Sequence, residues 1–148
     1  MADNIITLDN VKRDFYRKSE VIHAVDGVSL NIERGTFNIL RGKSGSGKTT
    51  LLNMIAMIDR PTDGKMTFNG EDITNASDKK RDNIRRTQLG IIFQNTALIA
   101  HMSAIENVEF ALSIAGIKSQ ERKRQAINWL DIMGIKERRN HMPAEMSG

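Results

Sequence analysis

The sequence contains no cysteine, and no apolar run in its 148 residues approaches the roughly 20 residues that a membrane-spanning helix needs. Without cysteine, disulfides, thiolate catalysis and Cys-ligated zinc are all excluded. The three histidines, His23, His101 and His141, lie too far apart in the sequence to indicate a metal cluster. The first residues lack the basic segment and apolar core of a signal peptide, so we expect a cytoplasmic chain.

Neither charge sign dominates, because 22 basic and 18 acidic residues leave a net charge of +4. This surplus is too small to require nucleic acid or an anionic membrane as a partner, and we expect no nucleic-acid partner. Basic residues do cluster between positions 77 and 89, but Asp78 and Asp82 interrupt them. We interpret that segment as a solvated, partly helical connector.

Residues 42–50 match the phosphate-binding loop pattern G-x-x-x-x-G-K-[ST], with apolar runs at 37–40 and 51–55 on either side. Glycines let backbone N–H groups converge on phosphate oxygens, and the N-terminus of the following helix adds partial positive charge. The pattern therefore predicts that the loop binds nucleotide phosphates. Lys48 is expected to reach the β- and γ-phosphates, and the Thr49 hydroxyl to bind Mg²⁺.

Hydrophobic periodicity and turn residues predict the elements around this loop. The expected strands cover residues 5–11, 21–32, 36–41, 65–70 and 90–93. The fourth ends in an Asn-Gly turn, and we expect the fifth to be buried.

The expected helices start with residues 48–58, whose face is formed by Leu51, Leu52, Ile55 and Ile58. A capping box at Ser103 and Glu106 opens a helix that ends at Gly116, and another follows from 119 to 134, with Met133 in its apolar stripe. Strands and helices give way to helices alone near residue 95. We therefore expect a nucleotide-binding core at 1–94 and an α-helical subdomain at 95–148.

Gln94 comes directly after the 90–93 segment, and with it the chain resembles the nucleotide-binding subunit of an ATP-binding-cassette (ABC) transporter. The resemblance rests on the phosphate loop, on Gln94 as the Q-loop glutamine and on residues 145–148 as the start of the signature motif. Residues 58–64 and 105–108 look most like the branch that powers lipoprotein release and macrolide export. The similarity covers essentially the whole chain.

The resemblance implies an α/β fold, a P-loop NTPase of ABC-ATPase type with a β-rich N-terminal region and a helical subdomain. It also implies ATP and Mg²⁺ as cofactors, a transmembrane permease as partner, and a second ATP-binding subunit that closes the site, on the cytoplasmic face of the membrane. Phe15 takes the place of the family's adenine-stacking aromatic with Tyr16 beside it, and either could stack. The implied nucleotide site is Phe15, Tyr16, Gly42, Ser44, Gly45, Ser46, Gly47, Lys48, Thr49 and Thr50, with Lys48 and Gln94 catalytic and Thr49 and Gln94 as metal ligands.

The family's magnesium-binding aspartate, catalytic glutamate and switch histidine follow the signature motif, and this sequence does not contain them. We therefore expect a truncated cassette that binds ATP without hydrolysing it. The central sheet would also be incomplete, leaving Ile39, Leu40, Ile91 and Ile92 exposed.

Two other functions stay open. Another P-loop enzyme, such as a GTPase or a small-molecule kinase, would need its own recognition motif, and no Asn-Lys-x-Asp follows the loop. A non-enzymatic module that docks on a membrane protein is the second. The apolar residues Leu98, Ile99 and Met102, with His101 among them, are either a contact surface for a transmembrane partner or part of the subdomain core.

Overall fold

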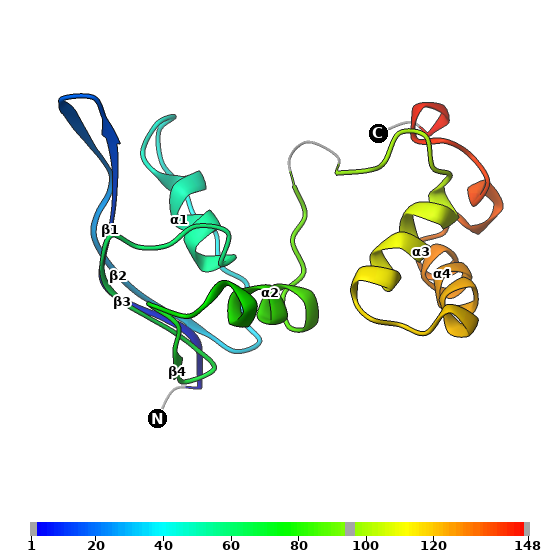
Figure 1. Cartoon of the computed structure of the whole chain (residues 1–148), viewed down its shortest axis with the longest axis horizontal. Coiled ribbons are helices and arrows are strands. Elements are labelled where there is room, and N and C mark those ends of the chain that lie inside the picture. Colours follow the sequence, from blue (N-terminus) through cyan, green and yellow to red (C-terminus); the bar gives the residue numbers. More distant parts are fainter. Residues whose placement is uncertain (1–2, 94–96, 147–148) are drawn as a thin grey trace. The chain divides into compact units, whose positions relative to one another are not determined.

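A computed structural model describes residues 3–93 and 97–146, which fall into two compact units that divide between Leu89 and Gly90 (Figure 1). In the first unit the strands are β1 Asn4–Arg17, β2 Glu20–Glu33, β3 Asp63–Phe68 and β4 Glu71–Asp72, and the helices are α1 Lys48–Ile55 and α2 Asp78–Thr87. The second contains α3 Ala104–Ile114, α4 Ser119–Ile132 and two short 3₁₀ helices, Lys136–Arg138 and Pro143–Glu145. The helices in the described ranges are all too short or too polar to cross a bilayer.

The four strands form an antiparallel sheet in the order β2-β1-β3-β4. The predicted strands at 5–11, 21–32 and 65–70 are confirmed, and the first two extend into a hairpin of two 14-residue strands. Asn69 and Gly70 have φ values of 51° and 76°, the left-handed conformation that a two-residue hairpin turn needs at both positions. The Asn-Gly signal therefore predicted the β3–β4 turn correctly.

The core of the first unit lies between this sheet and the two helices. Burial of apolar side chains from sheet and helices together is what holds α1 and α2 against the strands. Its buried residues are Ile6, Leu8, Val11, Val25, Met66 and Phe68 from the strands, Leu51, Met54 and Met57 from α1 and the turn after it, Ile73, and Ile84 of α2.

The predicted apolar face of α1 was partly wrong. Leu51 is buried and Ile55 packs against the core, as expected, but Leu52 and Ile58 are exposed, and Met54 and Met57 are buried instead. Leu51 and Met54 are the buried residues of α1 itself, so this short helix faces the sheet along a narrower stripe than the sequence suggested.

The basic segment 77–89 is mostly helical and largely exposed, as expected, but one face of it is buried against the rest of the unit. Ser77 accepts a hydrogen bond from the Lys80 N–H and caps α2, and both Ile84 and Arg81 are buried. The Arg81 side chain is only 5% exposed because its guanidinium is directed to carbonyl groups just beyond α1. From the sequence alone an arginine is expected to face solvent, because burial of a charged group is costly unless the group is paired with acceptors, here backbone carbonyls.

Segments 36–41 and 90–93 were predicted as strands, and neither is one. Within the described residues, the backbone hydrogen bond of segment 36–41 is from Thr36 N–H to the Glu33 carbonyl at 3.4 Å. A strand needs a neighbour to accept and donate its ladder bonds. Ile39, Leu40, Ile91 and Ile92 are exposed, as expected, so the prediction that 90–93 is buried was wrong.

The helical unit follows the sequence signals closely. The Ser103 hydroxyl and the Glu106 carboxylate form the predicted reciprocal capping box, and Gly116 and Gly134 have positive φ just after α3 and α4. Ile105 of α3 packs with Ala126 and Leu130 of α4 in a small core. Met133, predicted to belong to the apolar stripe, is 70% exposed, because α4 ends at Ile132 and the chain turns away at Gly134.

The capping box gives a testable dependence on pH. Hydrogen bonds from the Ser103 hydroxyl and backbone N–H lower the pKa of Glu106 from its ordinary value of 4.5. Because the folded-state pKa is lowered, the stabilisation is fully present above about pH 4.5 and is lost as pH falls through the folded pKa. We expect Glu106→Gln to lower the stability of the helical unit at neutral pH and to remove this part of its acid sensitivity.

Thermal unfolding followed by circular dichroism at pH 7 and pH 4 would measure both effects. Ser103→Ala should destabilise the unit by about 1 kcal/mol, the usual effect of losing a helix N-cap. Glu109→Gln, one turn further along α3, serves as the matched control. If Glu109→Gln and Glu106→Gln changed the pH dependence equally, the capping box would not be its cause.

Candidate functional site

The phosphate loop directly precedes α1, and its backbone has the conformation that the sequence pattern predicts. Gly45 and Gly47 have φ values of 78° and 81°, in the left-handed region that favours glycine. Gly47 is the N-cap of α1, and the Leu51 N–H donates to its carbonyl at 2.8 Å. The loop therefore ends at the N-terminus of a regular helix.

Packing around the loop also requires glycine. A Cβ on Gly47 would lie 2.1 Å from the Ala24 carbonyl oxygen of β2, and one on Gly42 would lie 2.7 Å from Ser46 Oγ. The first contact is with backbone and cannot be relieved by a side-chain rotation. The loop thus passes against β2, and Figure 1 shows it at the same end of the unit as the β1–β2 hairpin.

Lys48, the first residue of α1, folds its side chain back over the loop. Its Nζ donates to the carbonyl oxygens of Gly42 and Lys43 at 2.9 and 2.6 Å and lies 3.4 Å from Ser46 Oγ. The first turn of α1 contains no acidic residue. The lysine charge and the helix N-terminus therefore add to a local positive potential that suits an anion.

The remaining loop residues are accessible. Ser44, Gly45, Ser46 and Thr49 are exposed, whereas Thr50 is partly buried in the first turn of the helix. Thr49 therefore has a hydroxyl available to a ligand from solvent. These positions fit phosphate oxygens and a hard cation, which prefers oxygen ligands.

The two aromatic candidates differ in their surroundings. Tyr16 is 73% exposed, and Phe15 is 40% exposed with the Arg13 guanidinium over its ring at 4.4 Å from the centroid. Both lie near the end of β1, paired with Val21 and Ile22 of β2. Which of them contacts a base stays a prediction.

Some predicted residues are not placed. Gln94 lies outside the described residues, and so do Ser147 and Gly148 of the signature segment. The role of Gln94 in catalysis and in Mg²⁺ binding stays a prediction, as does the division of the chain at residue 94.

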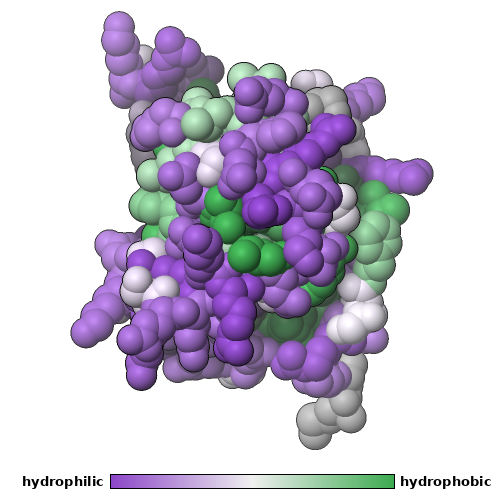
Figure 2. Space-filling view, turned by 90° about the vertical axis from the view of Figure 1, so that its right-hand side faces the viewer, coloured by the Kyte–Doolittle hydropathy of each residue, from purple (hydrophilic) through white to green (hydrophobic). Residues whose placement is uncertain are grey.

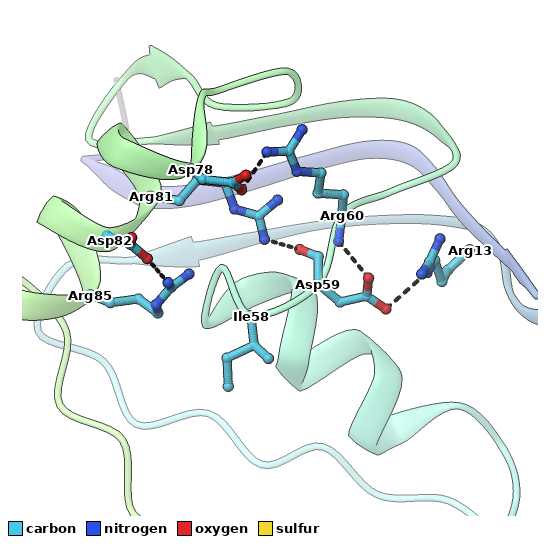
Figure 3. Close-up of a pocket in the computed structure, with 8 residues that line it drawn as sticks. All are labelled: Arg13, Ile58, Asp59, Arg60, Asp78, Arg81, Asp82 and Arg85. Carbon is cyan, nitrogen blue, oxygen red and sulfur yellow. Dashed lines mark hydrogen bonds and ion pairs between the residues drawn. The ribbon is translucent and has the colours of Figure 1, made fainter.

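Sequence reasoning missed a polar cluster beside α1. An open cavity of about 480 Å³ is lined by four arginines, three aspartates and Ile58 (Figure 3). Its arginines come from β1, α2 and the turn after α1, so they are far apart in the sequence. The i, i+2 spacing of Arg13 and Phe15 was the sequence signal that could have placed these two side chains together. No comparable spacing linked Asp59 to Arg13.

The comparisons with known proteins agree with this geometry. Residues 25–148 match the family model of the ABC transporter. The chain is 35% identical, over its full length, to the lipoprotein-releasing system ATP-binding protein LolD of Saccharophagus degradans, and 38% identical, also in full, to the macrolide export ATP-binding/permease protein MacB of Hyphomonas neptunium. It spans 65% and 23% of those two proteins.

The chain is also similar to a solved structure, the dimeric post-hydrolysis state of the ATP-binding cassette MJ0796 bound to ADP and Pi. The two superimpose with a TM-score of 0.85 at 34% sequence identity, and the match covers 96% of this chain and 63% of that one. The chain therefore spans less than two-thirds of each of these three proteins. The predicted α/β fold of ABC-ATPase type and the resemblance to the LolD and MacB branch are confirmed. This chain belongs to the ABC transporter family.

Proposed function

We propose that this chain binds Mg-ATP as the nucleotide-binding part of an ABC transporter. The conformation of the phosphate loop carries this proposal. Two left-handed glycines, a lysine ammonium and a helix N-terminus converge at one end of the sheet, and together they favour a polyphosphate. The ADP and Pi held by the related MJ0796 cassette support the same ligand class here.

Phe15 or Tyr16 would supply a stacking surface for adenine, because a base needs a π-face rather than a hydroxyl. Thr49 would hold Mg²⁺ together with Gln94. When bound, the ion neutralises charge on the β- and γ-phosphates. Titration with fluorescent ATP and GTP, each with Mg²⁺, would test the proposal, and preferential GTP binding would favour the alternative of a different P-loop enzyme.

By analogy with LolD and MacB, the protein would couple ATP binding and hydrolysis to transport through a transmembrane permease. A second ATP-binding subunit would close the site, as the dimeric state of the MJ0796 cassette suggests. The chain would then lie at the cytoplasmic face of the membrane. A module that docks on a membrane protein without enzymatic activity is the alternative, and phosphate release distinguishes the two.

The segment before α3 is a candidate surface for the permease. The Asn107 side chain accepts a hydrogen bond from the Ile99 N–H at 2.8 Å and donates to the carbonyls of Ile99, Met102 and Ser103. These bonds hold the segment in one conformation, with Leu98 half exposed and Met102 partly buried. Figure 2 shows that hydrophobic side chains are exposed among hydrophilic ones on the face that it presents.

We expect cysteines placed at positions 98 and 102 to cross-link to a permease in an assembled complex, with position 98 giving the higher yield because it is more exposed. The chain has no native cysteine, so the background is low. A cysteine at Lys118, just before α4, provides a control on the same unit. If neither position gave an adduct above this control, the segment would be assigned to the subdomain core.

A further inference from the structure

Arg13 covers one face of the Phe15 ring. The two residues are two positions apart on β1, the spacing that puts side chains on one face of a strand. The guanidinium carbon lies 4.4 Å from the ring centroid, within the range of a cation–π contact. The pairing of β1 with β2 is irregular on both sides of Arg13, and such bulges redirect side chains.

Arg13 is itself held by an acidic residue from another part of the unit. Its Nε donates to Asp59 Oδ2 at 2.8 Å, and both side chains are about three-quarters buried, with 25% and 24% exposed (Figure 3). The other carboxylate oxygen of Asp59 accepts the Arg60 N–H at 2.8 Å. The carboxylate is therefore fixed at both oxygens, and the guanidinium has a defined position above the ring.

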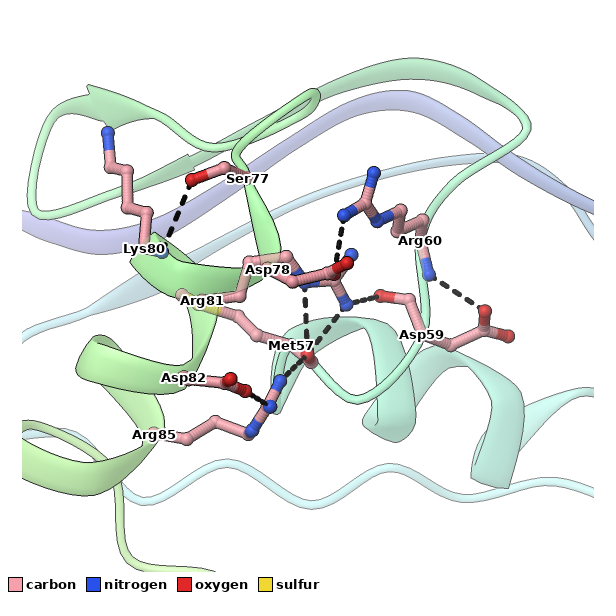
Figure 4. A network of polar contacts seen from close by, with 9 residues as sticks. All are labelled: Met57, Asp59, Arg60, Ser77, Asp78, Lys80, Arg81, Asp82 and Arg85. Carbon is pink, nitrogen blue, oxygen red and sulfur yellow. Dashed lines mark hydrogen bonds and ion pairs between the residues drawn. The ribbon is translucent and has the colours of Figure 1, made fainter.

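Asp59 is anchored in turn to the end of the helix that starts at the phosphate loop. The buried Arg81 of α2 donates from Nη2 to the carbonyl oxygens of Asp59 at 2.5 Å and Met57 at 2.6 Å (Figure 4). Arg85 also donates to the Met57 carbonyl. These bonds satisfy carbonyl acceptors in the turn just after α1, and they bring positive charge close to the C-terminal end of that helix, where cations are favourable. Continuous contacts thus connect the Phe15 ring to the helix that carries Lys48.

We propose that Arg13 and Asp59 are positioning residues for Phe15 as the adenine-stacking ring. This inference rests on the proposed binding of ATP. The guanidinium occupies one face of the ring and leaves the opposite face to the base. A ring that is already immobilised loses less side-chain freedom when the nucleotide binds. The same contacts fix the ring relative to α1, so that one ligand can reach both the ring and the phosphate loop.

The test compares two ligands, Mg-ATP and magnesium tripolyphosphate, by isothermal titration calorimetry. Tripolyphosphate carries the phosphates but has no base. We expect Arg13→Gln and Asp59→Asn each to weaken ATP binding by about 2- to 10-fold, the penalty of ordering one side chain on binding, and to leave tripolyphosphate binding unchanged. Thermal midpoints of both variants establish that they are folded.

A double-mutant cycle separates positioning from a direct contact. Phe15→Ala alone should weaken ATP binding by about 5- to 150-fold, the range for loss of one base–aromatic stack. In that background Arg13→Gln should cause no further loss. Arg34→Gln is the matched control, because it removes one charge and one ion pair, with Asp3 at 2.9 Å, from the same unit.

The outcomes are distinguishable. Equal weakening of ATP and tripolyphosphate by Arg13→Gln, or additive losses in the cycle, would overturn the inference in favour of a general charge effect. Unchanged ATP affinity in Phe15→Ala would also overturn it and leave the phosphate loop as the binding site. Unchanged affinity in Lys48→Ala would instead overturn the proposed function.

Discussion

Lys48→Ala is expected to reduce affinity for Mg-ATP by at least about 100-fold. The ammonium is placed over the loop, and two contacts with charged phosphate oxygens would each contribute about 1.5–3 kcal/mol. Their sum corresponds to a loss of two or more orders of magnitude. The fold should be retained, because the described contacts of Lys48 Nζ are with exposed loop atoms and not with the core.

Lys43→Ala is the matched control for this experiment. Lys43 belongs to the same loop and carries the same charge, but it occupies a position where the motif accepts any residue. Its replacement should change affinity only slightly. Fluorescent-ATP titration measures binding and circular dichroism measures the fold, and unchanged affinity in Lys48→Ala would reject the assignment of the loop.

The phosphate loop, the hairpin turn and the capping box could be predicted from the sequence because each is formed by residues that are close together along the chain. Gly45, Asn69 and Ser103 act on neighbours within a few residues, and the chemistry of the residue determines the local conformation. The residue-level pattern is then enough. The strands of the β1–β2 hairpin were found for the same reason, since their alternation is short-ranged.

Predictions from the sequence were wrong where the burial or pairing of a residue depends on a partner that is far away along the chain. Segment 90–93 is apolar enough for a buried strand, but Ile92 is fully exposed because nothing in the described structure pairs with it. Arg81 was misassigned for the opposite reason, because its acceptors on Met57 and Asp59 lie more than 20 positions away. Arg13 and Asp59 meet across 46 positions. The secondary-structure propensities of single residues do not predict contacts between residues so far apart along the chain.

The chain alone is expected to bind Mg-ATP without hydrolysing it at a measurable rate. Turnover needs a carboxylate that positions the attacking water, and three acidic residues near the loop or at the start of the helical subdomain already make other contacts. Asp59 is paired with Arg13, Asp63 accepts the Gly64 N–H at 2.8 Å, and Glu106 closes the capping box of α3. Losing a positioned general base typically forfeits about 10²- to 10⁴-fold in rate.

Charge stabilisation at the γ-phosphate by a second subunit would also be missing from the isolated chain, and such stabilisation is commonly the largest single contribution to catalysis. The two deficits multiply, so phosphate release should be indistinguishable from background.

The assay would follow release at saturating ATP after binding has been confirmed by titration, with Lys48→Ala measured in parallel to correct for contaminating ATPases. Lys48-dependent release at an ordinary enzymatic rate, about 1 s⁻¹ or more, would mean that a carboxylate in these residues acts as the base. Asp63 would then be the first to replace, because its recorded contact is with its own neighbour's backbone and leaves one carboxylate oxygen available for water.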